Sequence, residues 1–187
     1  MKNLYIFDCF GVIVSDVTKL WMDDHFDKET QQYICANYFR KVDTGVLSHV
    51  EMLNAMAAEF GMTAEQIANE WEKHLYVKQD TLDVITKLKS NGHTVALLSN
   101  ASREYLQYVF DKFDLYKYFD KMFVSAYFGC AKPDREFYRL CLDSFKEKFD
   151  KIYFTDDNPV NLVNLASMGI TAVQFTSAHQ FESDIFK

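Results

Sequence analysis

Two acidic sites follow apolar segments in this chain of 187 residues. Asp8 ends the apolar run 4–7, and the adjacent acids Asp156 and Asp157 follow the largely apolar run 152–155. A carboxylate can attack phosphorus as a nucleophile. Several carboxylates at one place repel one another strongly unless a hard cation such as Mg²⁺ lies between them. These residues therefore suggest nucleophilic chemistry at a metal site.

Three further polar residues lie at two other places in the chain. Ser99 and Asn100 come directly after the apolar run 94–98, and both side chains can donate hydrogen bonds to an anion. Lys132 precedes a proline that opens an expected helix, and a fixed ammonium there could neutralise carboxylates and hold a phosphoryl oxygen. Each residue alone has an ordinary explanation: a helix or turn cap for Asp8 and Ser99, a surface side chain for Lys132. Only the four sites together indicate a catalytic centre.

Strands and helices alternate in the segments that must position these residues. The patterning predicts strands near 4–7, 94–98, 122–125, 151–155 and 170–175, and helices near 82–88, 105–110, 134–145 and 159–168. Such alternation predicts an α/β fold, a Rossmann-like parallel sheet with helices on both faces. Active sites of these sheets gather at the carboxyl ends of the strands, which is where all the polar residues above fall.

Residues 15–77 follow a different pattern, with apolar residues at helical spacing and no convincing strand. Ser48 is followed by Glu51 and Thr63 by Gln66, the spacing of capping boxes that begin helices. We therefore expect a catalytic core formed by residues 1–14 and 78–187, interrupted by an inserted helical cap at 15–77.

Composition narrows the classes of partner. The formal net charge of −7 argues against a nucleic-acid partner, although a pocket can still attract a small anion. The four cysteines are scattered without metal-ligand spacing and indicate free thiols in a reducing compartment. The N-terminal apolar run is too short for a signal peptide or a membrane span. We expect a cytoplasmic protein without a membrane partner.

In their order along the chain, the four polar sites resemble the four motifs of the haloacid dehalogenase-like (HAD) hydrolases. Asp8, Gly11 and Val12 are in register with the first motif, Asp-x-Asp-Gly-(Thr/Val). The helical insert is similar to the cap of one branch of that family, and the nearest resemblance is to the group that includes the glucose 1-phosphate phosphatases. The resemblance covers essentially the whole chain.

The resemblance implies a Mg²⁺-dependent hydrolase acting on a small phosphorylated metabolite, and it implies the following roles. Asp8 is the nucleophile, and Asp8, Asp157 and the backbone carbonyl of Phe10 bind the metal. Ser99, Asn100 and Lys132 bind the phosphoryl group, and Lys132 also takes part in catalysis together with Asp156, which orients it.

Phe10 departs from the family pattern, because the phosphatases carry their general acid and base, an aspartate, at this place. Our leading hypothesis is a phosphatase that tolerates the loss, favouring a good leaving group such as the anomeric oxygen of a sugar phosphate. A second is a catalytically weak or inactive member that binds phosphometabolites. A third is a metal-independent 2-haloacid dehalogenase, since those enzymes carry an aromatic residue here. The adjacent acids Asp156 and Asp157 argue against the third.

Overall fold

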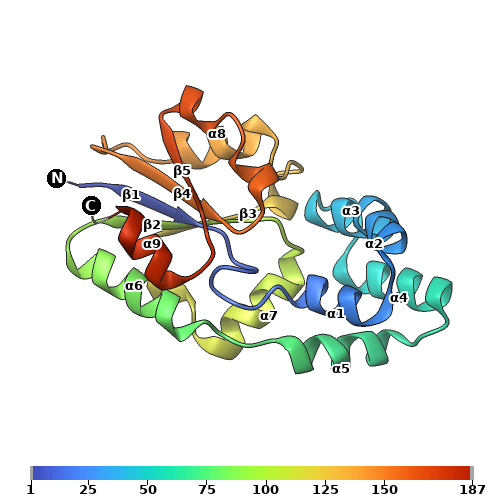
Figure 1. Ribbon diagram of the computed structural model, residues 1–187. Coiled ribbons are helices and arrows are strands. Elements are labelled where there is room, and N and C mark those ends of the chain that lie inside the picture. Colours follow the sequence, from blue (N-terminus) through green and yellow to red (C-terminus); the bar gives the residue numbers. More distant parts are fainter. Residues whose placement is uncertain (1, 186–187) are drawn as a thin grey trace.

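The computed structural model describes residues 2–185. At its centre is a parallel sheet of five strands in the order β3-β2-β1-β4-β5 (Figure 1). The strands are β1 (Leu4–Phe7), β2 (Thr94–Ser99), β3 (Lys121–Val124), β4 (Ile152–Asp156) and β5 (Ile170–Gln174). This sheet, with the helices that cover it, confirms the predicted fold class.

Alternate side chains of the central strands enter two separate apolar clusters. Tyr5 and Phe7 of β1 pack on one face of the sheet, in the cluster that also contains buried residues of α6, α7 and α9. Leu4 and Ile6 pack on the other face, with buried residues of α8. Because both faces are covered, the central strands are apolar along nearly their whole length rather than alternating with polar residues.

Four helices cover the sheet: one precedes β2 in the chain, and the others follow β2, β3 and β5. They are α6 (Gln79–Ser90), α7 (Arg103–Phe113), α8 (Arg135–Asp143) and α9 (Ala178–Ile185). Short 3-10 turns lie at Tyr116–Tyr118 and Ser125–Tyr127. Within residues 2–185, no helix is both long enough and apolar enough to cross a bilayer.

Between β1 and β2 the chain forms helices only, and we call residues 17–74 the helical insert. Its members are α1 (Val17–His25), α2 (Lys28–Ile34), a π-helical turn (Cys35–Phe39), α3 (Arg40–Asp43), α4 (His49–Phe60) and α5 (Ala64–His74). Both predicted capping boxes are present, at Ser48 and Thr63. The insert lies beyond the carboxyl end of the sheet (Figure 1), and Val14 pairs with Val77 where the chain enters and leaves it.

The predicted helix over 159–168 is wrong. Two short 3-10 turns, Pro159–Leu162 and Leu165–Met168, occupy this segment. Asn164 between them adopts the left-handed conformation at φ 61°, which interrupts any continuous helix. The backbone between β4 and β5 therefore follows a tighter path than a continuous helix, and of its apolar side chains Leu165 is buried whereas Val160 and Val163 are exposed.

Candidate active site

Register brings the ends of three strands level with one another. Phe7 pairs with Leu97 of β2 on one side and with Thr155 of β4 on the other. Asp8, the next residue, continues this pairing, because its backbone N–H donates to the carbonyl of Thr155 at 2.9 Å. The Asp8 side chain therefore emerges at the centre of the carboxyl edge, beside the acids that follow β4.

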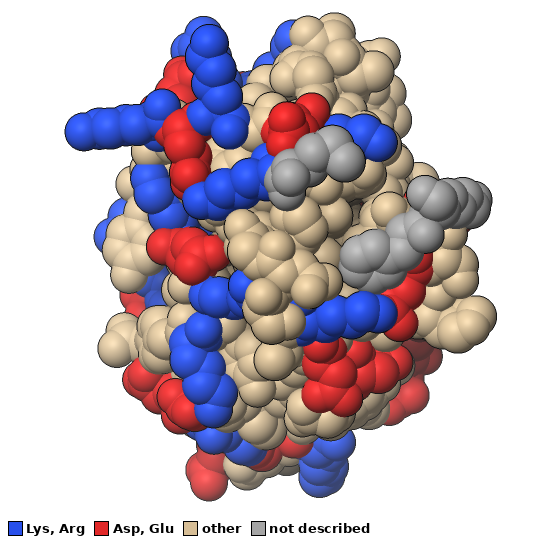
Figure 2. Space-filling view, turned by 90° about the vertical axis from the view of Figure 1, so that its left-hand side faces the viewer, with Lys and Arg blue, Asp and Glu red and all other residues tan. Residues whose placement is uncertain are grey.

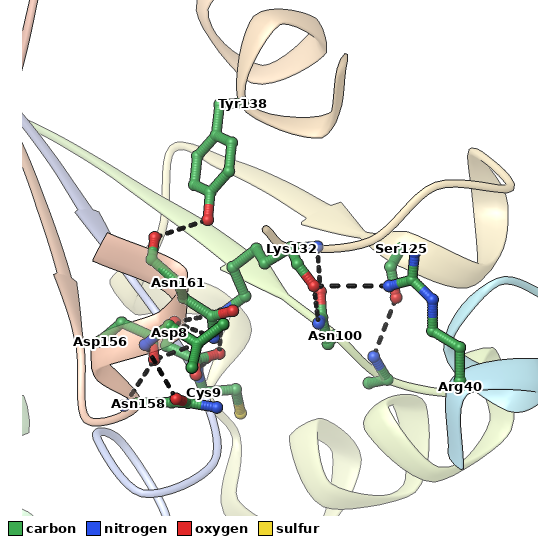
Figure 3. Close-up of polar contacts among 12 residues, drawn as sticks. Asp8, Cys9, Arg40, Asn100, Ser125, Lys132, Tyr138, Asp156, Asn158 and Asn161 are labelled. Atoms are coloured by element: carbon green, nitrogen blue, oxygen red, sulfur yellow. Dashed lines mark hydrogen bonds and ion pairs between the residues drawn. The ribbon is translucent and has the colours of Figure 1, made fainter. Parts of the chain in front are cut away.

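A buried ammonium joins two of the predicted acidic residues. The Nζ atom of Lys132 lies 2.8 Å from Oδ1 of Asp8 and 2.6 Å from Oδ2 of Asp156 (Figure 3). Lys132 is 2% exposed and Asp156 is fully buried. Charges that are removed from water in this way are held only where opposite charges and hydrogen bonds satisfy them.

The Asp156 carboxylate is satisfied by donors on every side. Besides Lys132, it accepts hydrogen bonds from Nδ2 of Asn161, at 3.1 and 3.0 Å to its two oxygens, and from the backbone N–H of Asn158 at 2.8 Å. The Asn161 backbone is fixed in turn, because the Tyr138 hydroxyl donates to its carbonyl at 2.7 Å (Figure 3). Asp156 is thus suited to orient Lys132 and has little capacity left to bind a cation.

Asn100 holds the loop that carries Lys132. Its Oδ1 accepts from the backbone N–H of Lys132 at 2.8 Å, and its Nδ2 donates to the carbonyl of Lys132 at 3.0 Å (Figure 3). The amide that we expected to face the phosphoryl group is therefore engaged by protein backbone. Ser99 is fully buried, and its hydroxyl has no hydrogen-bond partner among residues 2–185, so it keeps its capacity to donate.

Carboxylate oxygens of Asp8, Asp156 and Asp157 lie within 4.8 Å of one another, close enough to share a metal ion. Burial and the neighbouring acids Asp16 and Asp156 raise the pKa of Asp157 to about 6. Burial, followed by the charge of Asp156, also raises the pKa of Asp8, against the opposing effect of Lys132. A divalent cation would relieve this repulsion, so the donor set fits one.

Besides Asp156, the carboxylates of Asp8 and Asp157 lie close enough together to hold such a cation. The third ligand expected from the sequence is the backbone carbonyl of Phe10. Within the part of the chain that the structure describes, the Phe10 carbonyl accepts no hydrogen bond. All three are oxygen donors of the kind that Mg²⁺ prefers, and their role as its ligands stays a prediction.

Gly11 allows Asp157 to approach. A Cβ atom at Gly11, which has φ +83°, would lie 2.3 Å from Oδ2 of Asp157. We expect Gly11→Ala to displace that carboxylate and to weaken Mg²⁺ binding by about 10–100-fold, the range found when the support of a metal ligand is lost. The measurement is the Mg²⁺ dependence of thermal unfolding.

The matched control is Gly92→Ala. Gly92 has nearly the same backbone strain, at φ +81°, but no atom within 4 Å of the added Cβ. Both variants should lose stability, since alanine is strained at positive φ. Only Gly11→Ala should lose metal affinity, and equal Mg²⁺ dependence in the two variants would contradict this account of Gly11.

The side chain of Phe10 belongs to an aromatic stack. It stacks on Tyr105 of α7 at a centroid distance of 5.8 Å, and Tyr105 stacks on His49 of α4 at 5.1 Å. Trp71 of α5 meets Tyr105 edge-on at 5.2 Å. Phe10 therefore connects the nucleophile loop with α7 and the helical insert and supplies no proton donor.

A cavity of about 380 Å³ lies between the sheet edge and the helical insert. Its polar lining residues include Asp8, Asn100, Lys132, Asp157 and Asn161, and its apolar and aromatic ones include Phe10, Phe39, Met52, Trp71 and Tyr105. Two further acids, Asp16 and Asp43, also line it. The sequence predicts that residues 43–45 form a cap loop over the site, but it does not indicate what the Asp43 side chain contacts. Tyr138 and Asn158 were not predicted as site residues, since nothing in their local sequence indicates which side chains they meet.

Comparisons with known proteins agree with this arrangement of motifs. Residues 2–169 match the model of the haloacid dehalogenase-like hydrolases. Drimenol cyclase drtB from Aspergillus calidoustus is 28% identical over 154 residues, which are 79% of this chain and 29% of that protein. (S)-2-haloacid dehalogenase 4A from Burkholderia cepacia is 28% identical over 102 residues, 54% of this chain and 44% of the dehalogenase. This chain therefore spans less than half the length of either protein.

A third relative matches this chain over most of the length of both proteins. Sesquiterpene phosphatase astK from Aspergillus oryzae is 20% identical over 154 residues, 81% of this chain and 79% of that protein. Among solved structures, a HAD family enzyme from Bacteroides thetaiotaomicron superposes with a TM-score of 0.79 at 21% identity, covering 100% of this chain and 98% of that one. That enzyme has also been solved in complex with magnesium and inorganic phosphate. The match to the family model covers most of the sequence, so this chain belongs to the haloacid dehalogenase-like hydrolases.

Proposed function

We propose that this hydrolase is a Mg²⁺-dependent phosphomonoesterase that acts through an aspartyl-phosphate on Asp8. The observation that carries the proposal is the carboxylate of Asp8 at the head of the cavity, 2.8 Å from the buried ammonium of Lys132 and close to the carboxylate of Asp157. A nucleophilic carboxylate, a fixed positive charge and a second acid for a hard cation are what transfer of a phosphoryl group requires.

The residues of this chain would divide the work as follows. Asp8 attacks phosphorus, and Lys132 balances charge on the phosphoryl oxygens while Asp156 keeps it in place. The buried hydroxyl of Ser99 donates to the same group. Asp8, Asp157 and the Phe10 carbonyl would hold Mg²⁺, which supplies charge stabilisation to the phosphoryl oxygens when bound.

The residues that line the cavity indicate what kind of alcohol the substrate carries. Besides its polar residues, the cavity is lined by Phe39, Met52, Trp71 and Tyr105, against which a sugar ring or an apolar chain can pack. The volume of about 380 Å³ admits a small metabolite. A sesquiterpene phosphatase among the relatives supports a substrate that is the phosphate ester of an apolar alcohol. The missing acid at Phe10 supports a substrate with a good leaving group, such as the anomeric oxygen of a sugar 1-phosphate.

On the face turned away from the helical insert, the charges do not favour a nucleic-acid partner. On the face in Figure 2, basic and acidic side chains are interspersed, and they do not form one broad basic area. Binding to a phosphate backbone rewards such an area.

A haloacid dehalogenase is the less favoured reading of the same site. An aromatic residue at Phe10 suits a reaction whose halide leaves unprotonated, and a dehalogenase is among the relatives. Against it stand the adjacent acids Asp156 and Asp157, whose carboxylate oxygens lie within 4.8 Å of that of Asp8. Such an arrangement is costly without a cation.

The proposal is tested by phosphate release from three kinds of phosphomonoester: a sugar 1-phosphate, the matching sugar 6-phosphate and a terpenyl monophosphate. We expect turnover in Mg²⁺, with the 1-phosphate hydrolysed faster than the 6-phosphate. The terpenyl arm distinguishes an apolar wall from a sugar-binding wall. Absence of turnover on all three, with the protein folded and binding phosphate, would favour a binding protein instead.

A further inference from the structure

The cavity lacks a proton donor at Phe10 but contains another acid that the mechanism above does not use. Of the four acids that line it, Asp8 is the proposed nucleophile and Asp157 a proposed metal ligand. Asp16 caps α1, and its Oδ1 accepts from Lys19 and Thr18, both at 3.2 Å. Asp43 is the remaining acid.

The carboxyl of Asp43 is free to act on a ligand. Among residues 2–185 it forms no hydrogen bond and no ion pair within 4.0 Å, although it lines the same cavity as Asp8 and Lys132. A partly buried acid without a partner is unusual in a folded protein, because burial of a polar group is normally compensated. This freedom distinguishes Asp43 from Asp16.

The turn that carries Asp43 is fixed against the core on two sides. On one side, Arg40 in α3 pairs with Asp134 at 2.7 Å and donates to the carbonyl of Lys132 at 3.5 Å. On the other, a Cβ at Gly45 would lie 2.6 Å from the carbonyl oxygen of Ala126. The end of α3 is therefore attached to the loop that holds Lys132 (Figure 3), the cation nearest the nucleophile.

The charges around Asp43 suit a group that both gives and takes a proton. Burial raises the pKa of Asp43 to about 7, and the opposing charges of Lys132 and then Arg40 keep it from rising further. Both protonation states are then populated near neutral pH, which is the condition for efficient general acid and base catalysis.

We propose that Asp43 of the helical insert is the general acid and base that replaces the missing aspartate at Phe10. The inference rests on the proposed phosphatase function. In the first step an Asp8 oxygen bonds to phosphorus, the ester P–O bond breaks, and the leaving oxygen takes the proton of Asp43. In the second, water attacks the aspartyl-phosphate, Asp43 takes its proton, and the P–O bond to Asp8 breaks, which returns the carboxylate and releases phosphate.

His49 is another titratable group that lines the cavity and could exchange a proton near neutral pH. Its ring stacks on Tyr105, its Nδ1 lies 3.4 Å from the hydroxyl of Ser102, and burial lowers its pKa. These contacts hold the imidazole within the aromatic stack, whereas the Asp43 carboxyl forms no hydrogen bond or ion pair among residues 2–185. The two residues therefore give different predictions.

The test compares Asp43→Asn with the wild type on an alkyl phosphate and on a nitrophenyl phosphate, whose leaving group needs no proton. We expect kcat on the alkyl ester to fall by about 10²–10⁴-fold, the usual value of general acid–base help. With the aryl ester, a burst of nitrophenol equal to the enzyme should precede slow turnover, because the second step has lost its base. Intact-mass measurement should then find the phosphorylated protein accumulating.

Asp43→Glu keeps the carboxyl and should recover part of the alkyl ester activity, while His49→Gln should accumulate no phosphorylated protein. The proposal is overturned if Asp43→Asn hydrolyses the alkyl ester at close to the wild-type kcat without a burst, or if His49→Gln shows the burst instead. A wild type that releases no phosphate from either ester would overturn the proposed function itself, which is a different outcome.

Discussion

Asp8→Asn is expected to lower kcat for phosphomonoester hydrolysis by about 10⁴-fold or more, the scale on which loss of a covalent nucleophile acts. An amide of the same shape cannot attack phosphorus at a useful rate. The fold should persist, because Lys132 keeps its ion pair with Asp156 at 2.6 Å when the Asp8 charge is removed. The measurement is steady-state phosphate release at saturating Mg²⁺, with circular dichroism to establish folding.

Asp16→Asn is the matched control for this variant. Asp16 lines the same cavity but caps α1, and asparagine caps a helix about as well as aspartate. This control should retain most of the wild-type kcat. A folded Asp8→Asn protein that turns over as fast as Asp16→Asn would show that Asp8 is not the nucleophile.

Lys132→Met is expected to reduce the free energy of unfolding, measured in chelator, by about 3–5 kcal/mol, as breaking a buried ion pair commonly does. Methionine fills a similar volume but leaves Asp8 and Asp156 without their shared counter-ion, and both carboxylates are buried. Urea unfolding at neutral pH gives the change directly. Added Mg²⁺ should recover part of the loss, because it neutralises Asp8.

A surface lysine provides the control. Lys2 pairs with Glu147 at 2.6 Å, but the two side chains are 48% and 44% exposed. Exposed pairs are typically worth about 0–1 kcal/mol, so Lys2→Met should change stability little. If Lys132→Met were no more destabilised than Lys2→Met, the carboxylates would have to be neutral in the folded protein, and the charge balance described for the site would be incorrect.

The fold class was predictable because it depends on patterns that are local in the chain. Apolar runs that end in polar residues marked the strands, and capping boxes at Ser48 and Thr63 marked helix starts, as the structure confirms. The segment 159–168 was predicted wrongly because the left-handed conformation of Asn164 has no clear signal in its neighbours. Membership of the hydrolase family is shown, whereas the narrower glucose 1-phosphate phosphatase group stays a prediction.

The site was predictable only in part, for a related reason. Parallel strands bring their carboxyl ends to one edge, so Asp8, Lys132 and Asp156 could be expected to lie together. The stack of Phe10 on Tyr105 and the position of Asp43 depend on how the helical insert packs on the core, between residues far apart in the sequence. No spacing rule connects such residues, and the side chain that replaces the missing acid could therefore not be identified from the sequence.

The measurement that tests the central claim most directly is phosphate release by the wild-type protein with Mg²⁺ and with chelator, beside chloride release from a 2-chloroacid under the same two conditions. The account predicts phosphate release that chelator abolishes and Mg²⁺ restores, with no chloride release in either condition. Chloride release that is unaffected by chelator, without phosphate release, would contradict the account and assign Asp8 to carbon–halogen hydrolysis.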